Sequence, residues 1–144
     1  MDPEVQIFGR MFRNECRQIL EKNSLMLDLS FFQSEDKGDF ILIRMEDVWC
    51  IFDSSQHSVM ELARSKQYKT LTCGFSPYDT LVLSSSERGQ ALVSLQREIR
   101  TVSGQVVEPG DFLIQKSEEY SDMTLLLCTA VFLLLDRKQP VFEF

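Results

Sequence analysis

The longest apolar stretch of the chain, Leu125–Leu135, places the strongest constraint on how this protein can fold. Only Thr129 interrupts it. As a helix this stretch would be about 16 Å long at 1.5 Å per residue, whereas the hydrocarbon core of a bilayer is about 30 Å thick. It is therefore too short to span a membrane, and the rest of the protein has to cover it.

This segment is apolar on almost every side, so the spacing of its apolar residues is equally compatible with a helix and with a strand. The flanking residues favour a helix. Acidic residues precede the segment, Arg137 and Lys138 close it and Pro140 follows, as expected for the polarity and the end of a helix. We expect Ser121–Lys138 to form a largely buried helix.

Two further segments have the spacing of amphipathic helices. Asp2 followed by Pro3 is a typical helix start, and the predicted helix Pro3–Lys22 carries apolar residues at steps of three and four. Ser84 and Glu87 have the spacing of a capping box, and Gly104 is placed to end a second helix. The apolar stripe of that second helix consists of Leu92, Leu95, Ile99 and Val102.

The remaining apolar segments are short and resemble strands. Leu25–Phe31 alternates strictly, and Phe40–Arg44 and Val48–Phe52 flank a polar corner in the manner of a β-hairpin. A short helix is expected between Ser54 and Lys69. The other predicted strands are Lys69–Phe75, Thr80–Leu83, Gln105–Val107 and Asp111–Gln115.

The order of these elements predicts an α+β fold, since strands and helices do not alternate regularly as in a parallel sheet. We expect an N-terminal amphipathic helix, an antiparallel sheet of about five to seven strands, a middle helix and a buried C-terminal helix. No repeat, low-complexity tract or linker divides the chain, so we expect one domain over residues 1–144.

Charge and cysteine content narrow the functional class. Fifteen basic and 22 acidic residues give a net charge of −7, which disfavours nucleic acid and anionic membranes as partners. The four cysteines are widely spaced and form no C-x-x-C pair, which disfavours a zinc site. Each lies in an apolar stretch, so we expect buried, reduced thiols. Reduced thiols favour a location in the cytoplasm or nucleus. The cysteines are Cys16, Cys50, Cys73 and Cys128.

Catalytic groups are sparse in this sequence. The only histidine, His57, lies near Cys50 and Asp53, which makes these three the candidates for a Cys–His site. However, Cys50 falls within a predicted strand, not at a helix N-terminus where the dipole would stabilise a thiolate. The glycines are spread singly and form no phosphate-binding loop, and we expect no cofactor and no metal.

Two features favour binding over catalysis. Arg10, Arg13 and Arg17 have helical spacing on one flank of the first predicted helix, where they could contact an acidic partner or a phosphate. A second cluster, Arg88, Arg97 and Arg100, belongs to the next predicted helix.

The second feature is the alternating apolar C-terminus, which carries Phe142 and Phe144. It fits a final strand, a segment that docks on a partner, or an internal stretch of a longer chain.

We therefore expect a non-catalytic module for protein–protein interaction, and self-association would be one form of it. Two alternatives remain open: an enzyme with a Cys–His site of an unrecognised family, and a nucleic-acid-binding accessory protein that uses the arginine flank.

Overall fold

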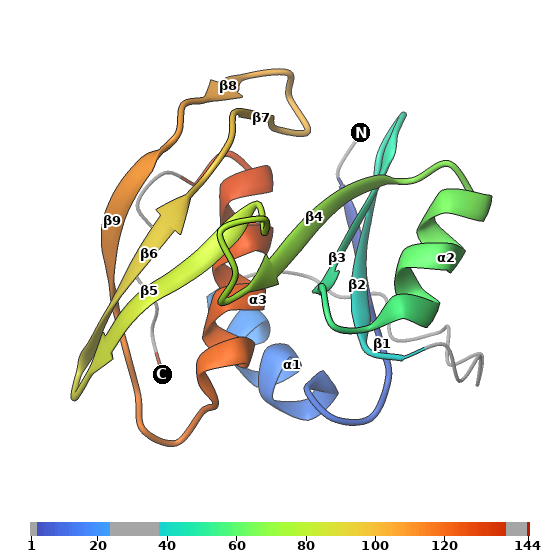
Figure 1. Cartoon of the computed structure of the whole chain (residues 1–144). Coiled ribbons are helices and arrows are strands. Elements are labelled where there is room, and N and C mark those ends of the chain that lie inside the picture. Colours follow the sequence, from blue (N-terminus) through green and yellow to red (C-terminus); the bar gives the residue numbers. More distant parts are fainter. Residues whose placement is uncertain (1–2, 24–37, 138–143) are drawn as a thin grey trace.

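A computed structural model describes residues 3–23, 38–137 and 144 of the chain, and its largest element is a mixed sheet of seven strands (Figure 1). The strand order in this sheet is β1-β2-β3-β4-β5-β6-β9. These strands are β1 (Glu4–Phe8), β2 (Phe40–Arg44), β3 (Val48–Asp53), β4 (Lys69–Gly74), β5 (Leu81–Glu87), β6 (Gln90–Leu95) and β9 (Gly110–Gln115). The short strands β7 (Ile99–Arg100) and β8 (Val106–Val107) pair with each other, and the three helices are α1 (Arg13–Lys22), α2 (His57–Ser65) and α3 (Asp122–Leu134). The α+β class is thus confirmed.

The predicted antiparallel arrangement is wrong in the centre of the sheet, where β3, β4 and β5 run parallel. Parallel neighbours require a crossover, and the short helix α2 supplies it between β3 and β4. Strands β4 and β5 overlap only at their ends, with Cys73 opposite Leu81, so a loop of six residues suffices to connect them. The predicted strands around this loop are therefore present, with a parallel rather than an antiparallel pairing.

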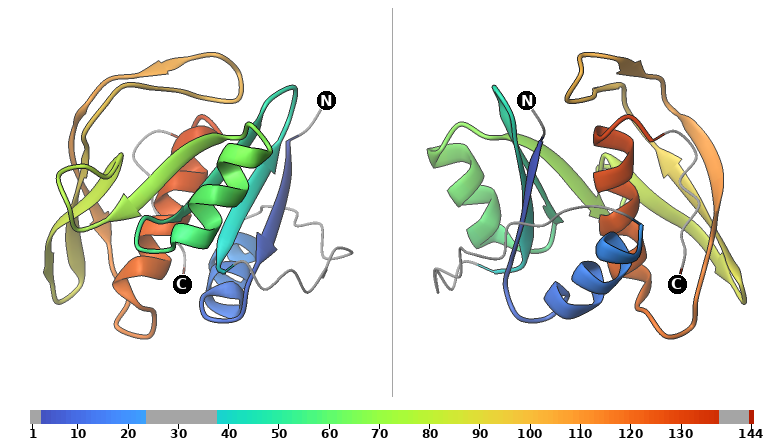
Figure 2. Two further views of the ribbon diagram at one scale, coloured as in Figure 1. Left: turned by 45° about the vertical axis from the view of Figure 1, so that its right-hand side comes forward. Right: turned by 180° about the vertical axis from the view of Figure 1, so that it is seen from behind.

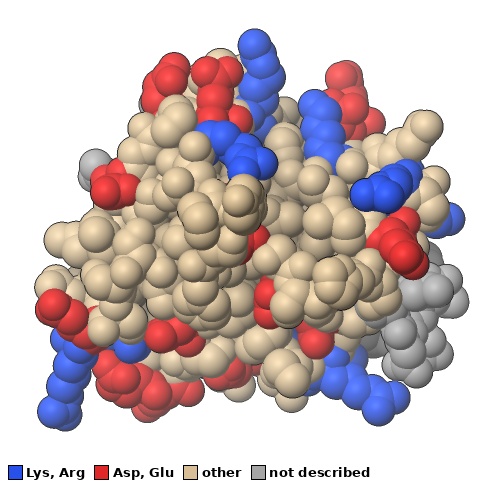
Figure 3. All heavy atoms as spheres, viewed as in Figure 1, with Lys and Arg blue, Asp and Glu red and all other residues tan. Residues whose placement is uncertain are grey.

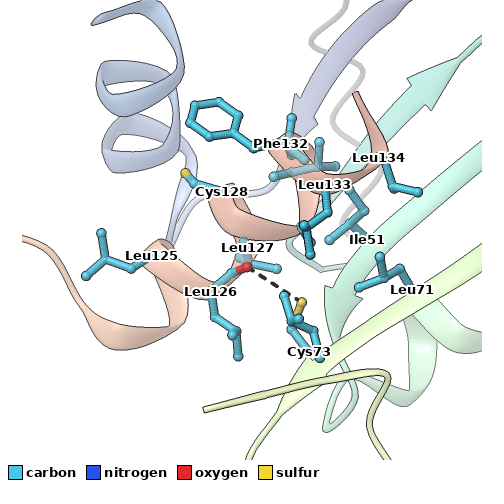
Figure 4. Packing of buried hydrophobic residues seen from close by; sticks show 14 of the residues in the cluster. Ile51, Leu71, Cys73, Leu125, Leu126, Leu127, Cys128, Phe132, Leu133 and Leu134 are labelled. Atoms are coloured by element: carbon cyan, nitrogen blue, oxygen red, sulfur yellow. Dashed lines mark hydrogen bonds between the residues drawn. The ribbon is translucent and has the colours of Figure 1, made fainter. Parts of the chain in front are cut away.

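The apolar C-terminal segment forms the buried helix that its flanking residues predict. Helix α3 begins after Ser121, whose side chain accepts a hydrogen bond from the Thr124 N–H, and it packs between the sheet and α1. Figure 2 shows α3 and α1 on one face of the sheet. Ile51 and Leu71 of the sheet point toward α3 in Figure 4. Because α3 is covered on all sides, apolar residues are stable around its whole circumference.

Helix α2 covers the opposite face of the sheet, but only over β2 and β3 (Figures 1 and 2). Val59 and Ala63 of this helix pack on Phe40, Leu42 and Phe52 in a second apolar cluster. In the described part of the chain, no helix covers the same face of β5, β6 and β9.

The predicted N-terminal helix Pro3–Lys22 is wrong over its first half, where the chain forms the edge strand β1. Val5 and Ile7 point into the core that contains α3, and β1 pairs with β2. Gly9 then adopts a φ of +101°, which ends the strand, and α1 begins only at Arg13. The apolar residues of this segment fit the spacing of a strand as well as that of a helix. Pairing with β2, which is distant in the sequence, selects the strand.

The predicted helix from Ser84 to Gly104 is also wrong, because this segment forms the β5–β6 hairpin and strand β7. Gly89 has a φ of +85° in the turn, which favours glycine. The residues that reach the core are Ala91, Val93 and Leu95, which alternate as in a strand. The predicted helical stripe combined residues that lie on opposite faces of the sheet, such as Leu92 and Leu95.

Several shorter predictions are confirmed. The hairpin of β2 and β3, the helix α2, and the strands β8 and β9 all lie where the sequence pattern places them. The predicted strand Leu25–Phe31 lies outside the described residues. Within the described residues, no helix is long and apolar enough to cross a bilayer.

Candidate functional site

The structure does not bring Cys50, Asp53 and His57 together. Cys50 is fully buried in the apolar cluster under α2, and burial raises the pKa of its thiol to about 12. Asp53 lies on the opposite face of the sheet, beside Cys73, and its carboxylate accepts the Ser55 N–H at 3.0 Å. His57 is exposed at the first residue of α2. A thiol held in its protonated form is a poor nucleophile, so this geometry gives no support to a Cys–His site.

The other cysteines described are also free and buried. Burial raises the pKa values of Cys73 and Cys128 well above the ordinary thiol range, and nearby acidic groups add to the effect. In Figure 4, Cys73 points toward α3, with Sγ 4.0 Å from the Leu126 carbonyl oxygen. These thiols act as small apolar core residues. Among the described residues, no cluster of three metal-ligating side chains is present.

The three arginines of the predicted flank are only partly on one helix. Arg10 is exposed and precedes α1, whereas Arg13 and Arg17 lie one turn apart within it. Glu15 on the same helix is directed toward α3, where it accepts the Thr124 hydroxyl at 2.9 Å.

The second arginine cluster separates in the structure. Arg88 lies in the β5–β6 turn, while Arg97 and Arg100 line one pocket.

At the C-terminus, the Phe144 ring stacks on Tyr120 with a centroid distance of 5.8 Å. Phe144, which we expected to bind a partner, therefore packs partly against the protein itself, and 37% of it remains exposed. Phe142 lies outside the described residues. The C-terminal residue therefore packs near the start of α3, on the helix side of the sheet.

The structure reveals a surface that the sequence did not predict, which we call the open face. It is the outer side of β5, β6 and β9, and three rows of paired residues form it. The rows are Val82–Ser94–Asp111, Ser85–Leu92–Leu113 and Glu87–Gln90–Gln115. Val82 and Ser94 are buried, so the accessible part of the face consists of Asp111 and the other two rows. On the other side of the same strands, Ala91, Val93, Leu95 and Ile114 pack into the core.

The charged residues of the open face are all acidic, and none lies in its central row. Its nine residues include no lysine or arginine, and its acids, Glu87 and Asp111, lie in the outer rows. Leu113 in the central row is 61% exposed. Figure 3, viewed as in Figure 1, shows a broad uncharged area over β5 and β6 with charged residues mainly around the rim.

Two large aromatic residues of the β4–β5 loop extend this surface. Phe75 and Tyr78 are 64% and 84% exposed. The buried carboxylate of Asp79 accepts the Ser76 N–H at 3.2 Å and orders the loop. The Thr80 N–H donates to the Thr72 hydroxyl, which fixes the loop on the side of the sheet that carries α2 (Figures 1 and 2).

The sequence contained a signal for this face, namely the alternation of Ala91, Val93 and Leu95, but the apparent helical stripe concealed it. Comparison with known proteins assigns no family: no family model matches the chain, and no curated protein or solved structure is significantly similar to it.

Proposed function

We propose that this protein is a non-catalytic module for protein–protein interaction, with the open face as its principal interface. The observation that carries this proposal is the exposure of Leu113 in an uncharged row, on a face of β5, β6 and β9 that no described helix covers. The central region of protein interfaces is depleted of charged residues and enriched in aromatic ones. The open face and the neighbouring Phe75 and Tyr78 fit that pattern.

The size of the surface predicts a modest affinity. Three strands about 4.8 Å apart and about 20 Å long cover roughly 300 Å² in projection. A stable complex buries about 800 Å² on each partner, so the open face needs the β4–β5 loop and further contacts to reach that value. We expect a reversible complex rather than a permanent one.

Charge favours a different protein as the occupant, with a neutral or basic surface. Two copies, each with a net charge of −7, would repel by about 7 kcal/mol at a separation of about 30 Å in salt-free water. A Debye length of about 8 Å reduces this repulsion more than tenfold at physiological ionic strength. Self-association is thus opposed, though not prevented, and it would strengthen as salt is added.

The arginine flank and the C-terminus remain proposed as secondary contacts. Arg13 and Arg17 share one side of α1, which supports binding to an acidic segment of the same partner. The free and buried cysteines support a partner in the cytoplasm or nucleus, where thiols stay reduced. Catalysis by Cys50 and nucleic-acid binding by the arginine flank are the weaker alternatives, since burial suppresses the Cys50 thiolate and the chain is acidic.

The test compares three variants of the tagged protein in native extract, with quantitative mass spectrometry. Leu113→Asp alters the open face, Arg13→Glu with Arg17→Glu alters the flank, and Ser65→Asp places the same added charge on exposed α2 as a control. A candidate partner must be retained by the control and lost by Leu113→Asp. All variants must show the thermal unfolding of a folded protein.

Calorimetry with the purified candidate partner then tests whether it binds directly to the open face. We expect Leu113→Asp to weaken direct binding by about tenfold or more, the effect of losing a residue worth about 1.4 kcal/mol. Binding to a basic partner should weaken with salt, whereas light scattering would reveal a second copy as the occupant. Equal affinities for wild type and Leu113→Asp would rule out the open face as the interface.

A further inference from the structure

A pocket of about 270 Å³ lies beside β7, contains none of the nine residues of the open face and touches the β4–β5 loop at Thr80. It is lined by Trp49, Lys69, Thr70, Thr80, Arg97, Glu98, Ile99 and Arg100. The starts of β3 and β4 form one wall, and the segment from Arg97 to Arg100 forms another. Residues from three distant parts of the sequence therefore meet here.

The pocket concentrates positive charge on an acidic chain. Lys69, Arg97 and Arg100 face a single acid in the lining, Glu98, whereas the whole chain has 15 basic and 22 acidic residues. The Lys69 amine is held at 2.9 Å from Asp47 and 5.6 Å from the Trp49 ring centroid, so its charge is partly neutralised. The two arginines thus supply most of the positive potential.

The pocket is also partly preorganised. The Arg97 guanidinium donates to the Tyr78 carbonyl oxygen at 2.8 Å, which fixes the side chain at the rim. Ile99 is buried, and its two-residue strand pairs with β8, which holds Arg100 in place. Side chains that are already ordered lose less conformational entropy when a ligand binds.

A second pocket of about 340 Å³ adjoins the first, because Trp49 and Lys69 line both. Its other lining residues are Met45, Glu46, Asp47, Thr101 and Val102. The acids Glu46 and Asp47 would repel an anion at this end, while Met45 and Val102 offer apolar surface. A ligand that occupies both pockets would therefore have a defined orientation.

We propose that the first pocket binds an oxyanion, phosphate or carboxylate, and that the second takes an uncharged ring attached to it. Guanidinium groups bind both anions through paired hydrogen bonds, and the hydroxyls of Thr70 and Thr80 provide further donors. Small-molecule sites usually have volumes of about 300–1,000 Å³. The first pocket lies just below this range and the second near its lower end, so each would hold a small group. This binding activity does not require the proposed protein interface, because none of the nine residues of the open face lines either pocket.

Trp49 gives a direct readout, since it is the only tryptophan of the chain and belongs to both pockets. The full chain is titrated with phenyl phosphate, benzoate and inorganic phosphate while Trp49 fluorescence is recorded. We expect a saturable change, tighter binding of phenyl phosphate than of inorganic phosphate, and weaker binding as ionic strength rises. Comparison of phenyl phosphate with benzoate identifies which oxyanion is preferred.

The variant Arg97→Gln with Arg100→Gln should raise the Kd for phenyl phosphate about tenfold or more. Arg64→Gln with Arg88→Gln removes the same charge from exposed positions outside both pockets and should change it less than about twofold. Arg100→Gln alone serves as the second pocket variant if loss of the Arg97 bond to Tyr78 impairs folding.

No saturable change with any probe at millimolar concentrations would overturn the proposal. The same holds if the control pair weakens binding as much as the pocket pair, because the signal would then reflect net charge alone. Neither result bears on the open face, where Leu113 is tested separately.

Discussion

At the residue scale, a close contact between Gly74 and Asp79 constrains the chain. Gly74 ends β4, and a Cβ atom at this position would lie 2.3 Å from Oδ2 of Asp79. The Asp79 side chain is buried and holds the β4–β5 loop through the Ser76 N–H. The glycine is therefore required by its neighbour and not by an unusual backbone angle.

Gly74→Ala should destabilise the protein by about 1–3 kcal/mol, because the Asp79 carboxylate must move from its buried position. The measurement is the free energy of unfolding in urea. Gly110→Ala is the control, since nothing lies within 4 Å of a Cβ atom there. Equal stabilities for the two variants would contradict the observed contact.

Cys50 is the second informative residue, because its burial couples stability to alkaline pH. Burial raises the pKa of its thiol from an ordinary 9.0 to about 12. The unfolded chain therefore loses this proton first as pH rises, and the folded state binds more protons. The contribution of Cys50 to stability is complete below pH 9 and decreases between about pH 9 and pH 12.

We expect the free energy of unfolding to fall less steeply with pH in Cys50→Ala than in the wild type. The difference should approach about 1.4 kcal/mol per pH unit above pH 9.5 or so. Val59→Ala, in the same apolar cluster, removes packing but no ionisable group and should keep the wild-type slope. Identical slopes for Cys50→Ala and Val59→Ala would show that the thiol is not protected in the folded state.

At the scale of single elements, α3 depends on tertiary contacts at both of its ends. At its N-terminus, Ser121 accepts the Thr124 N–H at 3.1 Å, and Glu15 of α1 accepts both the Thr124 hydroxyl and the Ser121 N–H. At its C-terminus, the Val102 N–H donates to the Leu134 carbonyl oxygen at 2.9 Å. These bonds satisfy backbone groups that a helix end leaves without partners.

Ser121→Ala should lower the free energy of unfolding by about 1 kcal/mol, the usual cost of a lost N-cap. Thermal or urea unfolding measures the change. Ser65→Ala is a matched control, since its hydroxyl bonds only to the Leu62 carbonyl of an exposed helix end, and we expect a change below about 0.5 kcal/mol. A loss for Ser121→Ala no larger than for the control would mean that Glu15 alone caps the helix.

At the scale of the whole molecule, the sheet is covered unevenly. Helices α3 and α1 pack on one face along its length, whereas α2 covers only part of the other (Figure 2). Strand β3 is thus enclosed between helices on both faces, whereas β9 is the last strand on the side that α2 does not cover. This asymmetry produces the open face and predicts where the protein is least stable locally.

Backbone amides of β3, β4 and α3 should exchange with deuterium most slowly, and those of β7, β8 and β9 much faster. Local opening requires less free energy where few buried apolar contacts must be broken. Hydrogen exchange followed by mass spectrometry on dilute protein measures this order. Within the described residues β9 pairs only with β6. Protection of β9 equal to that of β3 would contradict the expected order and would indicate that another segment or copy pairs with β9.

The sequence alone determined the elements whose local pattern has one interpretation. The segment of α3 is apolar and flanked by charges of the right polarity, and the hairpin of β2 and β3 has two apolar runs around a polar corner. The net charge and the scarcity of catalytic groups likewise follow from composition. The sequence identified Cys50, Asp53 and His57 by residue type, but only the structure placed Cys50 and Asp53 on opposite faces of the sheet.

Only the tertiary structure decided whether the segments around Val5 and Leu92 form strands or helices. Their apolar residues fit both a period of two and steps of three and four, so local propensity did not distinguish strand from helix. Pairing with remote strands, such as Glu4 opposite Arg44, supplied backbone hydrogen bonds that no local pattern contains. The open face and the Arg97–Arg100 pocket arise from that pairing, because both are built from residues that meet only after the sheet has formed.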